Sequence, residues 1–210
     1  MFESNFVTII GNIAGGFEFD HEFLGEKFYK TYILCERTSG NKDVLPVVVS
    51  ERICDVKENL CGRRVLAQGS IRTYNTHDDL KSQLIIYLFA SVFDTSGEIE
   101  LGSEDVNEVF LDGFICKSPI YRKTPLGRDI SDVVLAVNRP YGKSDYIPCI
   151  VWGRNAIWIE NLPVGSRIKL SGRFQSREYS KKNPDGTTIE KMAYEVSVIR
   201  LEECERGEEE

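Results

Sequence analysis

Hydrophobic and polar residues alternate along several segments of the chain, most clearly over residues 167–179. Ile168, Leu170 and Phe174 point to one side of this segment, and the other side carries Arg167, Lys169, Ser171, Arg173, Gln175, Arg177 and Tyr179. A period of two over this length predicts a long β-strand with one buried face. Because the other face is basic and ends in an aromatic ring, we expect it to contact something other than the protein core.

Four further β-rich segments surround this strand in the second half of the chain, separated by clusters of Gly, Pro, Asn and Asp. They cover residues 109–115, 132–137, 146–152 and 194–201. Residues 154–162 have the apolar spacing of a two-turn helix that Pro163 and Gly165 would end. The run from Asn183 to Gly186 predicts an exposed turn between the last two strands. Three strands, a short helix and two more strands predict a five-stranded Greek-key barrel, the OB-fold.

The same pattern occurs twice in the chain. Residues of the first half recur 102 positions later, and after one inserted residue the offset becomes 103, as in Asn5 and Asn107, Gly11 and Gly113, Arg37 and Arg139, Asp43 and Asp145, Arg64 and Arg167, and Gly69 and Gly172. Because the offset holds across loops as well as apolar runs, it indicates a duplicated domain. The corresponding strands of the first half are expected at residues 7–13, 29–35, 44–49, 64–74 and 84–93, with a helix over residues 53–60.

The sequence therefore predicts an all-β chain of two tandem OB-folds with one short helix each. The expected domains are residues 1–94 and 106–201, joined by a linker over residues 95–105 and followed by an acidic tail over residues 202–210. The linker is rich in Gly, Ser and acidic residues and poor in apolar ones, as is typical of a segment between domains.

Charge is unevenly distributed along the chain, whose formal net charge is −7. Residues 1–105 carry 10 Lys or Arg and 17 Asp or Glu, residues 106–200 carry 15 and 10, and residues 201–210 carry 1 and 6. The second half can attract a polyanion locally while the tail competes for the same surface. Such charges also keep a protein soluble, and charge alone leaves both interpretations open.

Motifs of catalysis, metal binding and membrane insertion are missing from the sequence. The chain has no G-x-S-x-G, G-x-x-x-x-G-K, H-E-x-x-H or C-x-x-C spacing, and its only histidines are His21 and His77. The pairs Asp78-Asp79 and Glu104-Asp105 lie in polar contexts and predict solvated turns rather than metal ligands. We expect no cofactor, no metal and no enzymatic activity, and reduced thiols in a soluble cytoplasmic protein without a leader or membrane span.

Aromatic residues are interleaved with cations in the second half. Unpaired bases stack on aromatic rings, and Lys and Arg neutralise phosphates with release of counterions. The rings are Tyr141, Tyr146, Trp152 and Tyr179, and two of them, Tyr146 and Trp152, share one face of a regular strand. Trp152 alone also fits a core position, but four rings with these cations favour a surface for a single strand. The cations are Arg122, Lys123, Arg128, Arg139, Lys143, Arg154, Arg173, Arg177, Lys181, Lys182 and Lys191.

The motif order of the second half resembles the bacterial single-stranded-DNA-binding protein family, the tetrameric OB-fold family, along nearly its whole length. The motifs are a first-strand glycine, an "LA" second strand, the triplet Trp152-Gly153-Arg154 before the helix, and the G-S-x-I-x-L-x-G-R strand over residues 165–173. Tyr141, Tyr146, Trp152 and Tyr179 fall where family members carry base-stacking rings. The resemblance implies single-stranded DNA as the ligand.

The first half departs from this pattern, because Ser39, Val44, Ser50 and Thr76 occupy the places of the four rings. This half either binds DNA by another route, through Tyr74, Arg72, Arg37 and Arg52, or serves mainly as an assembly partner. We favour assembly, because the loss of rings and of positive charge removes the two largest contributions to single-strand affinity.

Assembly and partners are implied by the resemblance. Family members typically combine four OB-folds, so two per chain imply a homodimer. The tail is acidic as in the family but has no Pro-Phe tip, so the resemblance does not imply recruitment of replication or repair proteins by that route. The tail either shields the basic half or solvates the terminus.

The function expected from the sequence is non-enzymatic, sequence-independent binding of single-stranded DNA in replication, recombination or repair, in the cytoplasm at the nucleoid. One alternative is an OB-fold protein-interaction module, such as a primosome or replication-restart accessory, which the acidic first half would fit. Another is a nuclease, which would need carboxylates that converge on a metal. The choice between DNA and RNA is open, because stacking and phosphate contacts differ little until a 2′-hydroxyl is recognised.

Overall fold

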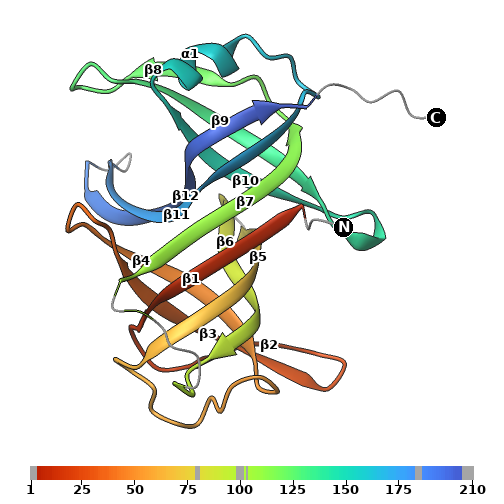
Figure 1. The fold of residues 1–210 in the computed structure, drawn as a ribbon, viewed down its shortest axis with the longest axis vertical. Helices are drawn as coiled ribbons and strands as arrows, with labels where there is room; N and C mark the ends of the chain where they lie inside the picture. Colours follow the sequence, from red (N-terminus) through yellow and green to blue (C-terminus); the bar gives the residue numbers. More distant parts are fainter. Residues whose placement is uncertain (1–3, 79–80, 98–101, 103, 183–185, 205–210) are drawn as a thin grey trace.

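The protein is described by a computed structural model that covers residues 4–78, 81–97, 102, 104–182 and 186–204. Its strands form one twelve-stranded sheet that is folded into two barrels, one above the other along the long axis (Figure 1). The first half contains β1 (Asn5–Ile13), β2 (Glu18–Phe23), β3 (Glu26–Glu36), β4 (Lys42–Ser50), β5 (Arg64–Asp78) and β6 (Lys81–Asp94). The second half contains β7 (Val106–Ile115), β8 (Ile120–Lys123), β9 (Asp129–Asn138), η1 (Pro140–Gly142), β10 (Ser144–Trp152), α1 (Arg154–Glu160), β11 (Arg167–Lys182) and β12 (Thr188–Glu203).

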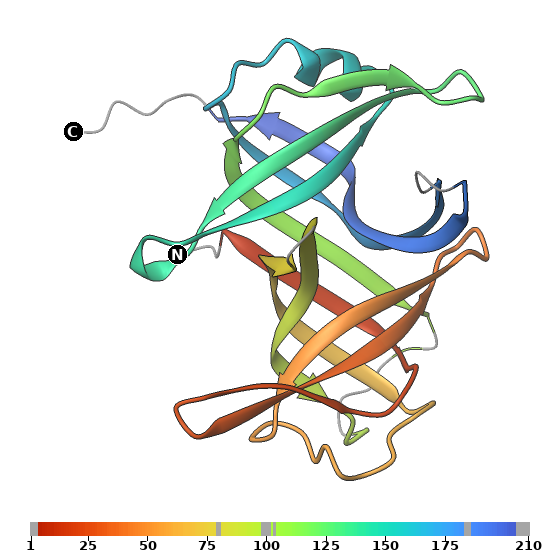
Figure 2. The same ribbon diagram turned by 180° about the vertical axis from the view of Figure 1, so that it is seen from behind.

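Each half closes its own barrel by the same pairings. In the first half β1 pairs with both β3 and β5, and β4 runs parallel to β6. In the second half β7 pairs with β9 and β11, and β10 runs parallel to β12. These pairings confirm the two tandem OB-folds, and the rear view shows both barrels from their other side (Figure 2).

The two barrels are joined by an antiparallel pairing of β1 with β7. Val7 pairs with Val109, its own counterpart in the repeat, and Phe6 pairs with Phe110. A register centred on two equivalent residues relates the halves by a local two-fold axis. The hydrophobic core therefore runs through both barrels, with Ile9 and Leu111 each fully buried beside this axis.

Buried polar contacts cross the junction in matched pairs. Asp43 and Asp145 are both fully buried aspartates. Asp145 accepts the backbone N–H of Thr73 at 2.7 Å, and Asp43 accepts that of Ser176 at 2.9 Å. In return the Thr73 hydroxyl accepts the N–H of Tyr146, and the Ser176 hydroxyl accepts the N–H of Val44. Each half thus satisfies backbone groups of the other.

Repeated glycines have a steric cause at two places in each barrel, on the first strand at Gly11 and Gly113 and in the long hairpin at Gly69 and Gly172. A Cβ on Gly69 would lie 2.0 Å from the carbonyl oxygen of Phe89, and one on Gly172 would lie 2.2 Å from that of Ser197. Both glycines follow a register shift in the long hairpin of their barrel. A side chain would separate the two strands of the hairpin, so this position accepts only glycine.

The prediction of a helix over residues 53–60 was wrong, because turns occupy this segment. The side chain of Asp55 accepts the N–H of Lys57 at 3.0 Å, and that of Asn59 accepts the N–H of Cys61 at 3.2 Å. Such local side-chain bonds compete with helical ones. The expected helix of the second half is present as α1.

The five predicted strands of each barrel are present, and β2 and β8 each add a short edge strand that, within the described residues, pairs only with β3 and β9, respectively. At the end of the linker Asp105 is not a solvated turn residue. Its carboxylate forms an ion pair with Arg64 at 2.7 Å and accepts the backbone N–H of Glu36 at 2.7 Å. Residues 183–185 of the turn predicted over residues 183–186, residues 98–101 and 103 of the linker, and residues 205–210 of the tail lie outside the described residues.

Candidate nucleic-acid interface

Strand β10 carries the first two candidate rings on its outer face. Its burial alternates, so that Tyr146 and Trp152 are exposed while Ile147, Cys149 and Val151 are buried in the barrel. Trp152 is not a core residue, because 38% of its surface is exposed. Its indole N–H donates to the hydroxyl of Ser197 on β12 at 3.0 Å, and this bond holds the ring in one orientation.

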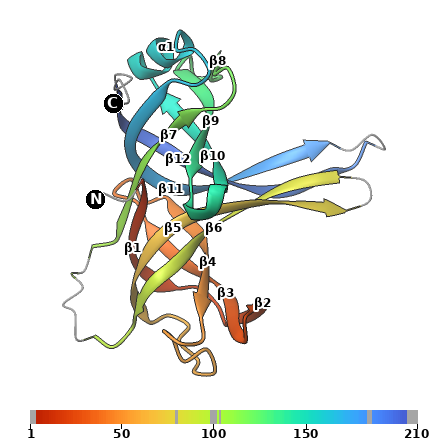
Figure 3. The ribbon, with the colours of Figure 1, turned by 90° about the vertical axis from the view of Figure 1, so that its right-hand side faces the viewer.

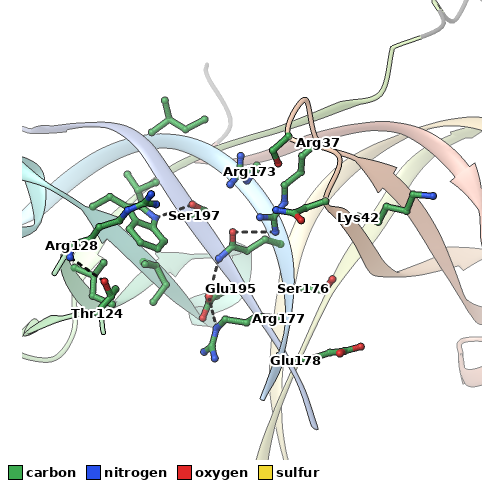
Figure 4. Close-up of a pocket in the computed structure, with 18 of the residues that line it drawn as sticks. Arg37, Lys42, Thr124, Arg128, Arg173, Ser176, Arg177, Glu178, Glu195 and Ser197 are labelled. Atoms are coloured by element: carbon green, nitrogen blue, oxygen red, sulfur yellow. Dashed lines mark hydrogen bonds and ion pairs between the residues drawn. The ribbon is translucent and has the colours of Figure 1, made fainter. Parts of the chain in front are cut away.

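Trp152 lines a groove at the junction of the two halves, which we call the junction groove (Figure 4). Its volume is about 1040 Å³. The wall from the second half comes from β8, the β8–β9 loop, β9, β10, β11 and β12. The wall from the first half comes from β4 and the loop between β3 and β4. The basic residues of these walls are Arg37, Lys42, Arg122, Arg128, Arg173 and Arg177.

Arg173 is a cation of this groove whose guanidinium has no hydrogen-bond or ion-pair partner among the described residues. Its Nε is buried and makes no hydrogen bond. Burial, and then the neighbouring positive charge of Arg37, lower the pKa of Arg173. Figure 4 shows Arg173 on β11 beside Arg37 of the first half. An anion in the groove would satisfy the free donors and offset the repulsion.

Several of the other predicted phosphate contacts are already paired with carboxylates. Arg122 contacts Asp132 at 2.7 Å, Lys123 contacts Asp129 at 3.7 Å and Arg177 contacts Glu195 at 3.3 Å. These three cations remain about half exposed or more, so each keeps donors that face solvent.

Arg139 differs from these three, because it pairs with a buried carboxylate at the junction of the two halves. Its side chain lies 3.1 Å from the fully buried carboxylate of Asp145, and Arg72 of the first half reaches the same carboxylate at 3.0 Å. Its counterpart Arg37 contacts Asp43 at 2.6 Å. Hydrogen bonding to Asp43 raises the pKa of Arg37 above its ordinary value. The repeated Arg and Asp positions are therefore structural.

A second groove lies between the two long hairpins, β5–β6 and β11–β12, which project side by side (Figure 3). We call it the hairpin groove, and its volume is about 1100 Å³. The second half contributes Tyr179, Lys181 and Lys191 to its lining. The guanidinium carbon of Arg177 lies 5.9 Å from the centre of the Tyr179 ring, as in a cation–π contact.

The first half contributes rings of its own to the hairpin groove. Tyr74 and Tyr87 line it, and their rings meet edge to face with centroids 6.0 Å apart. Burial raises the pKa of Tyr87 to about 12. Lys30 adds a cation on the same side. Tyr87 and Lys30 were not predicted from the sequence, because only the first-half positions equivalent to the four rings of the second half were compared.

The four predicted rings do not lie in one groove. Trp152 belongs to the junction groove and Tyr179 to the hairpin groove. Tyr141 is 99% exposed on η1, where its φ of 66° turns the chain, and it lines neither groove. Tyr146, Lys143 and Arg154 also lie on the surface outside the two grooves, and the side chain of Lys182 lies outside the described residues.

Three of the four replacements in the first half border the same grooves, and the fourth, Ser50, is buried. Ser39 and Val44 line the junction groove, and Thr76 lines the hairpin groove. Of the alternative contacts considered for this half, Arg72 and Arg37 are committed to the buried aspartates and Arg52 contacts Glu26 at 3.2 Å. Tyr74 lines the hairpin groove, and Arg37 lines the junction groove while it remains paired with Asp43.

The described part of the chain holds no group of three His, Cys, Asp or Glu residues that could bind a metal ion. In the same part no helix is long and apolar enough to cross a membrane. All six cysteines are free, and Cys35 and Cys149 are buried.

Comparison with known proteins places the second half in a described family. The model of the "Single-strand binding protein family" matches residues 106–202. "Single-stranded DNA-binding protein 1" of Staphylococcus aureus (strain COL) is 37% identical over 91 residues, which are 40% of this chain and 53% of that protein. The chain thus spans about half the length of this relative.

Two further similarities extend this finding. The "Single-stranded DNA-binding protein" of Clostridium tetani (strain Massachusetts / E88) is 39% identical over 104 residues, which are 45% of this chain and 70% of that protein. The crystal structure of the wild-type single-stranded DNA binding protein from Thermus aquaticus aligns with 98% of this chain and 95% of its own, with a TM-score of 0.75 and 19% identity. This last likeness concerns the fold, and it covers both barrels.

Proposed function

Because the chain belongs to the single-strand binding protein family, we propose that it binds single-stranded DNA without sequence preference and without enzymatic activity, and protects or organises exposed strands in replication, recombination or repair. Rings stack on bases and cations neutralise phosphates, so neither kind of contact depends on base identity. The relatives named above are single-stranded DNA-binding proteins by name, which supports the proposal.

The observation that carries the proposal is the junction groove. A partly exposed indole, held by Ser197, lies in the same groove as the unpartnered guanidinium of Arg173. A strand in this groove would stack a base on Trp152 and place a phosphate near Arg173. Arg122, Arg128 and Arg177 would supply further phosphate contacts.

The hairpin groove extends the proposed path. Tyr179, Lys181 and Lys191 would contact the strand from the second half, and Tyr74 and Lys30 from the first. The first half therefore acts mainly in assembly, through its buried junction, and contributes one wall to each groove. Arg139 is not among the proposed contacts, because its guanidinium is paired with the buried carboxylate of Asp145.

We also propose that two chains form a homodimer through the outer face of the β1–β7 pairing. Phe6 and Phe110 face each other across these strands on the side away from the core, and Phe114 is exposed on the same face of β7. An apolar patch on an open sheet face is a common site of association. This would bring four OB-folds together.

Titration of fluorescence with oligo-dT tests the proposed function. The chain has two tryptophans, so a Trp158→Phe variant reports on Trp152 alone. We expect quenching at saturation and an affinity that falls steeply with salt, with little difference between dT and dA oligomers. Unquenched emission, or an affinity that salt does not change, would contradict the mechanism. Competition between dT and rU oligomers decides between DNA and RNA.

A further inference from the structure

The two ends of the sheet are formed by equivalent elements of the repeat. β2 and β8 are the first and last strands in the sheet order, and within the described residues each pairs with one neighbour only, β3 and β9 respectively. They lie toward opposite ends of the long axis of the molecule (Figure 1). Each therefore presents unpaired backbone N–H and C=O groups along its outer edge.

These equivalent ends carry opposite charges. Residues 18–26, from β2 to the start of β3, hold four acidic side chains and no Lys or Arg. Residues 117–128, from the segment before β8 to its turn, hold four basic side chains and no Asp or Glu. Among them Glu18 and Glu22 on one end, and Lys117 and Arg128 on the other, are exposed and form no ion pair within the described chain.

Both ends also expose large apolar side chains. Phe19, Phe23 and Leu24 are exposed on the β2–β3 hairpin, and Ile120 and Leu126 are exposed on the β8–β9 hairpin. An edge strand with free backbone groups, exposed apolar side chains and one sign of charge is suited to pair with an edge of the opposite sign.

We propose that the acidic β2 end of one copy of this chain docks on the basic β8 end of another copy, with the two edge strands extending one sheet into the next. The contact joins two different surfaces, so each copy keeps one free end. Contacts of this kind generate open rows rather than closed rings unless the rotation happens to close. Such rows are separate from the homodimer face, which lies on β1 and β7.

The opposite signs argue against a purely protective role of the edge charges. Charged side chains on edge strands commonly keep sheets from pairing with one another. Like charges on both ends would serve that purpose, because two copies would then repel in every edge-to-edge arrangement. Opposite charges repel only in the arrangements β2 to β2 and β8 to β8, and they favour β2 to β8.

Charge reversal tests this contact in the full-length protein. One variant, Glu18→Lys with Glu22→Lys, has two basic ends, and the other, Lys117→Glu with Lys123→Glu, has two acidic ends. In sedimentation velocity at low salt we expect the wild type to form species larger than its homodimer, and each variant alone to associate at least about tenfold more weakly. An equimolar mixture of the variants should associate again, because each basic end then meets an acidic one.

Controls make the result specific. Glu202→Lys with Glu203→Lys is an equal reversal on exposed residues of β12 and should associate as the wild type does. A dT oligomer of one binding site should bind the Glu18→Lys, Glu22→Lys variant at least as tightly as the wild type, because neither residue lines a groove. The proposal fails if the wild type forms nothing beyond the homodimer at low salt, if either variant alone associates like the wild type, or if the mixture stays dissociated.

Discussion

The carboxylate of Asp145 in the second half accepts the backbone N–H of Thr73 in the first at 2.7 Å, while Arg72 and Arg139 hold it from both sides at 3.0 and 3.1 Å. Asp145 is fully buried, and its counterpart Asp43 accepts the N–H of Ser176 and pairs with Arg37. It is one of the interactions that make the two barrels a single unit.

Removal of this carboxylate should destabilise the protein strongly. Asp145→Ala leaves two arginines and a backbone N–H without their acceptor, so we expect a loss of about 2–4 kcal/mol in the free energy of unfolding. Asp145→Asn keeps an acceptor for the N–H and should lose less. Denaturation by urea measures both variants. An equal loss from Asp129→Ala, whose carboxylate is partly exposed, would show that the junction is not the reason.

Substitution of Trp152 should weaken single-strand binding. Trp152→Ala removes one stacking platform, which corresponds to about 1–3 kcal/mol of binding free energy. Trp158 is the matched control, because it is similarly exposed, at 40% against 38%, and lines neither groove. Titrations with a fluorescently labelled dT oligomer compare the two variants. If Trp158→Ala reduced affinity as much as Trp152→Ala, the junction groove would lose its assigned role.

Arg173 should contribute to the salt dependence of binding. Its guanidinium has no partner among the described residues, so a bound phosphate would be its first counterion. For Arg173→Ala we expect the slope of log affinity against log salt to become shallower by about 0.7, the value for one phosphate contact on a single strand. Arg200→Ala removes an equal charge from an exposed position outside the grooves and should leave the slope nearly unchanged. Two equal slope changes would indicate a general effect of net charge.

Stability should fall at alkaline pH because of two thiols, one buried and one partly buried. Burial raises the pKa of Cys35 from 9.0 to about 12, and that of Cys54 from 9.0 to about 11. Above pH 9 the unfolded chain releases these protons while the folded chain retains them. The free energy of unfolding should therefore decline as the pH rises from about 9 toward 11, by up to about 1.4 kcal/mol per pH unit for each thiol. Urea denaturation at several pH values measures the decline, and Cys35→Ala should reduce its slope.

The duplication and the barrel fold could be predicted because apolar alternation and the repeat offset are visible in the sequence without knowledge of which residues meet in the fold. The helix over residues 53–60 could not be excluded, because its apolar spacing is helical while Asp55 and Asn59 bond to nearby backbone instead. The edge strand β2 has exposed residues on both faces, so it shows no alternation that a search for half-buried strands could detect.

The candidate site was predictable in its residue types but not in its arrangement. Trp152 could be recognised as a surface ring from its cationic surroundings. The role of Arg139 could not be predicted, because the carboxylate of Asp145 beside it is buried only when the first half packs against the second. The walls that Lys42, Tyr74 and Tyr87 provide depend in the same way on contacts between residues far apart in the sequence.

The pairing of Val7 with Val109 has an evolutionary consequence. In an oligomer of separate identical chains, every mutation is copied onto every barrel, so no barrel can specialise without the others. Here one gene encodes both sides of the pairing, and a mutation alters only one of them. The amino-terminal barrel can therefore differ from the carboxyl-terminal one, as it does in its net negative charge and in Ser39, Val44, Ser50 and Thr76 at the places of the four rings.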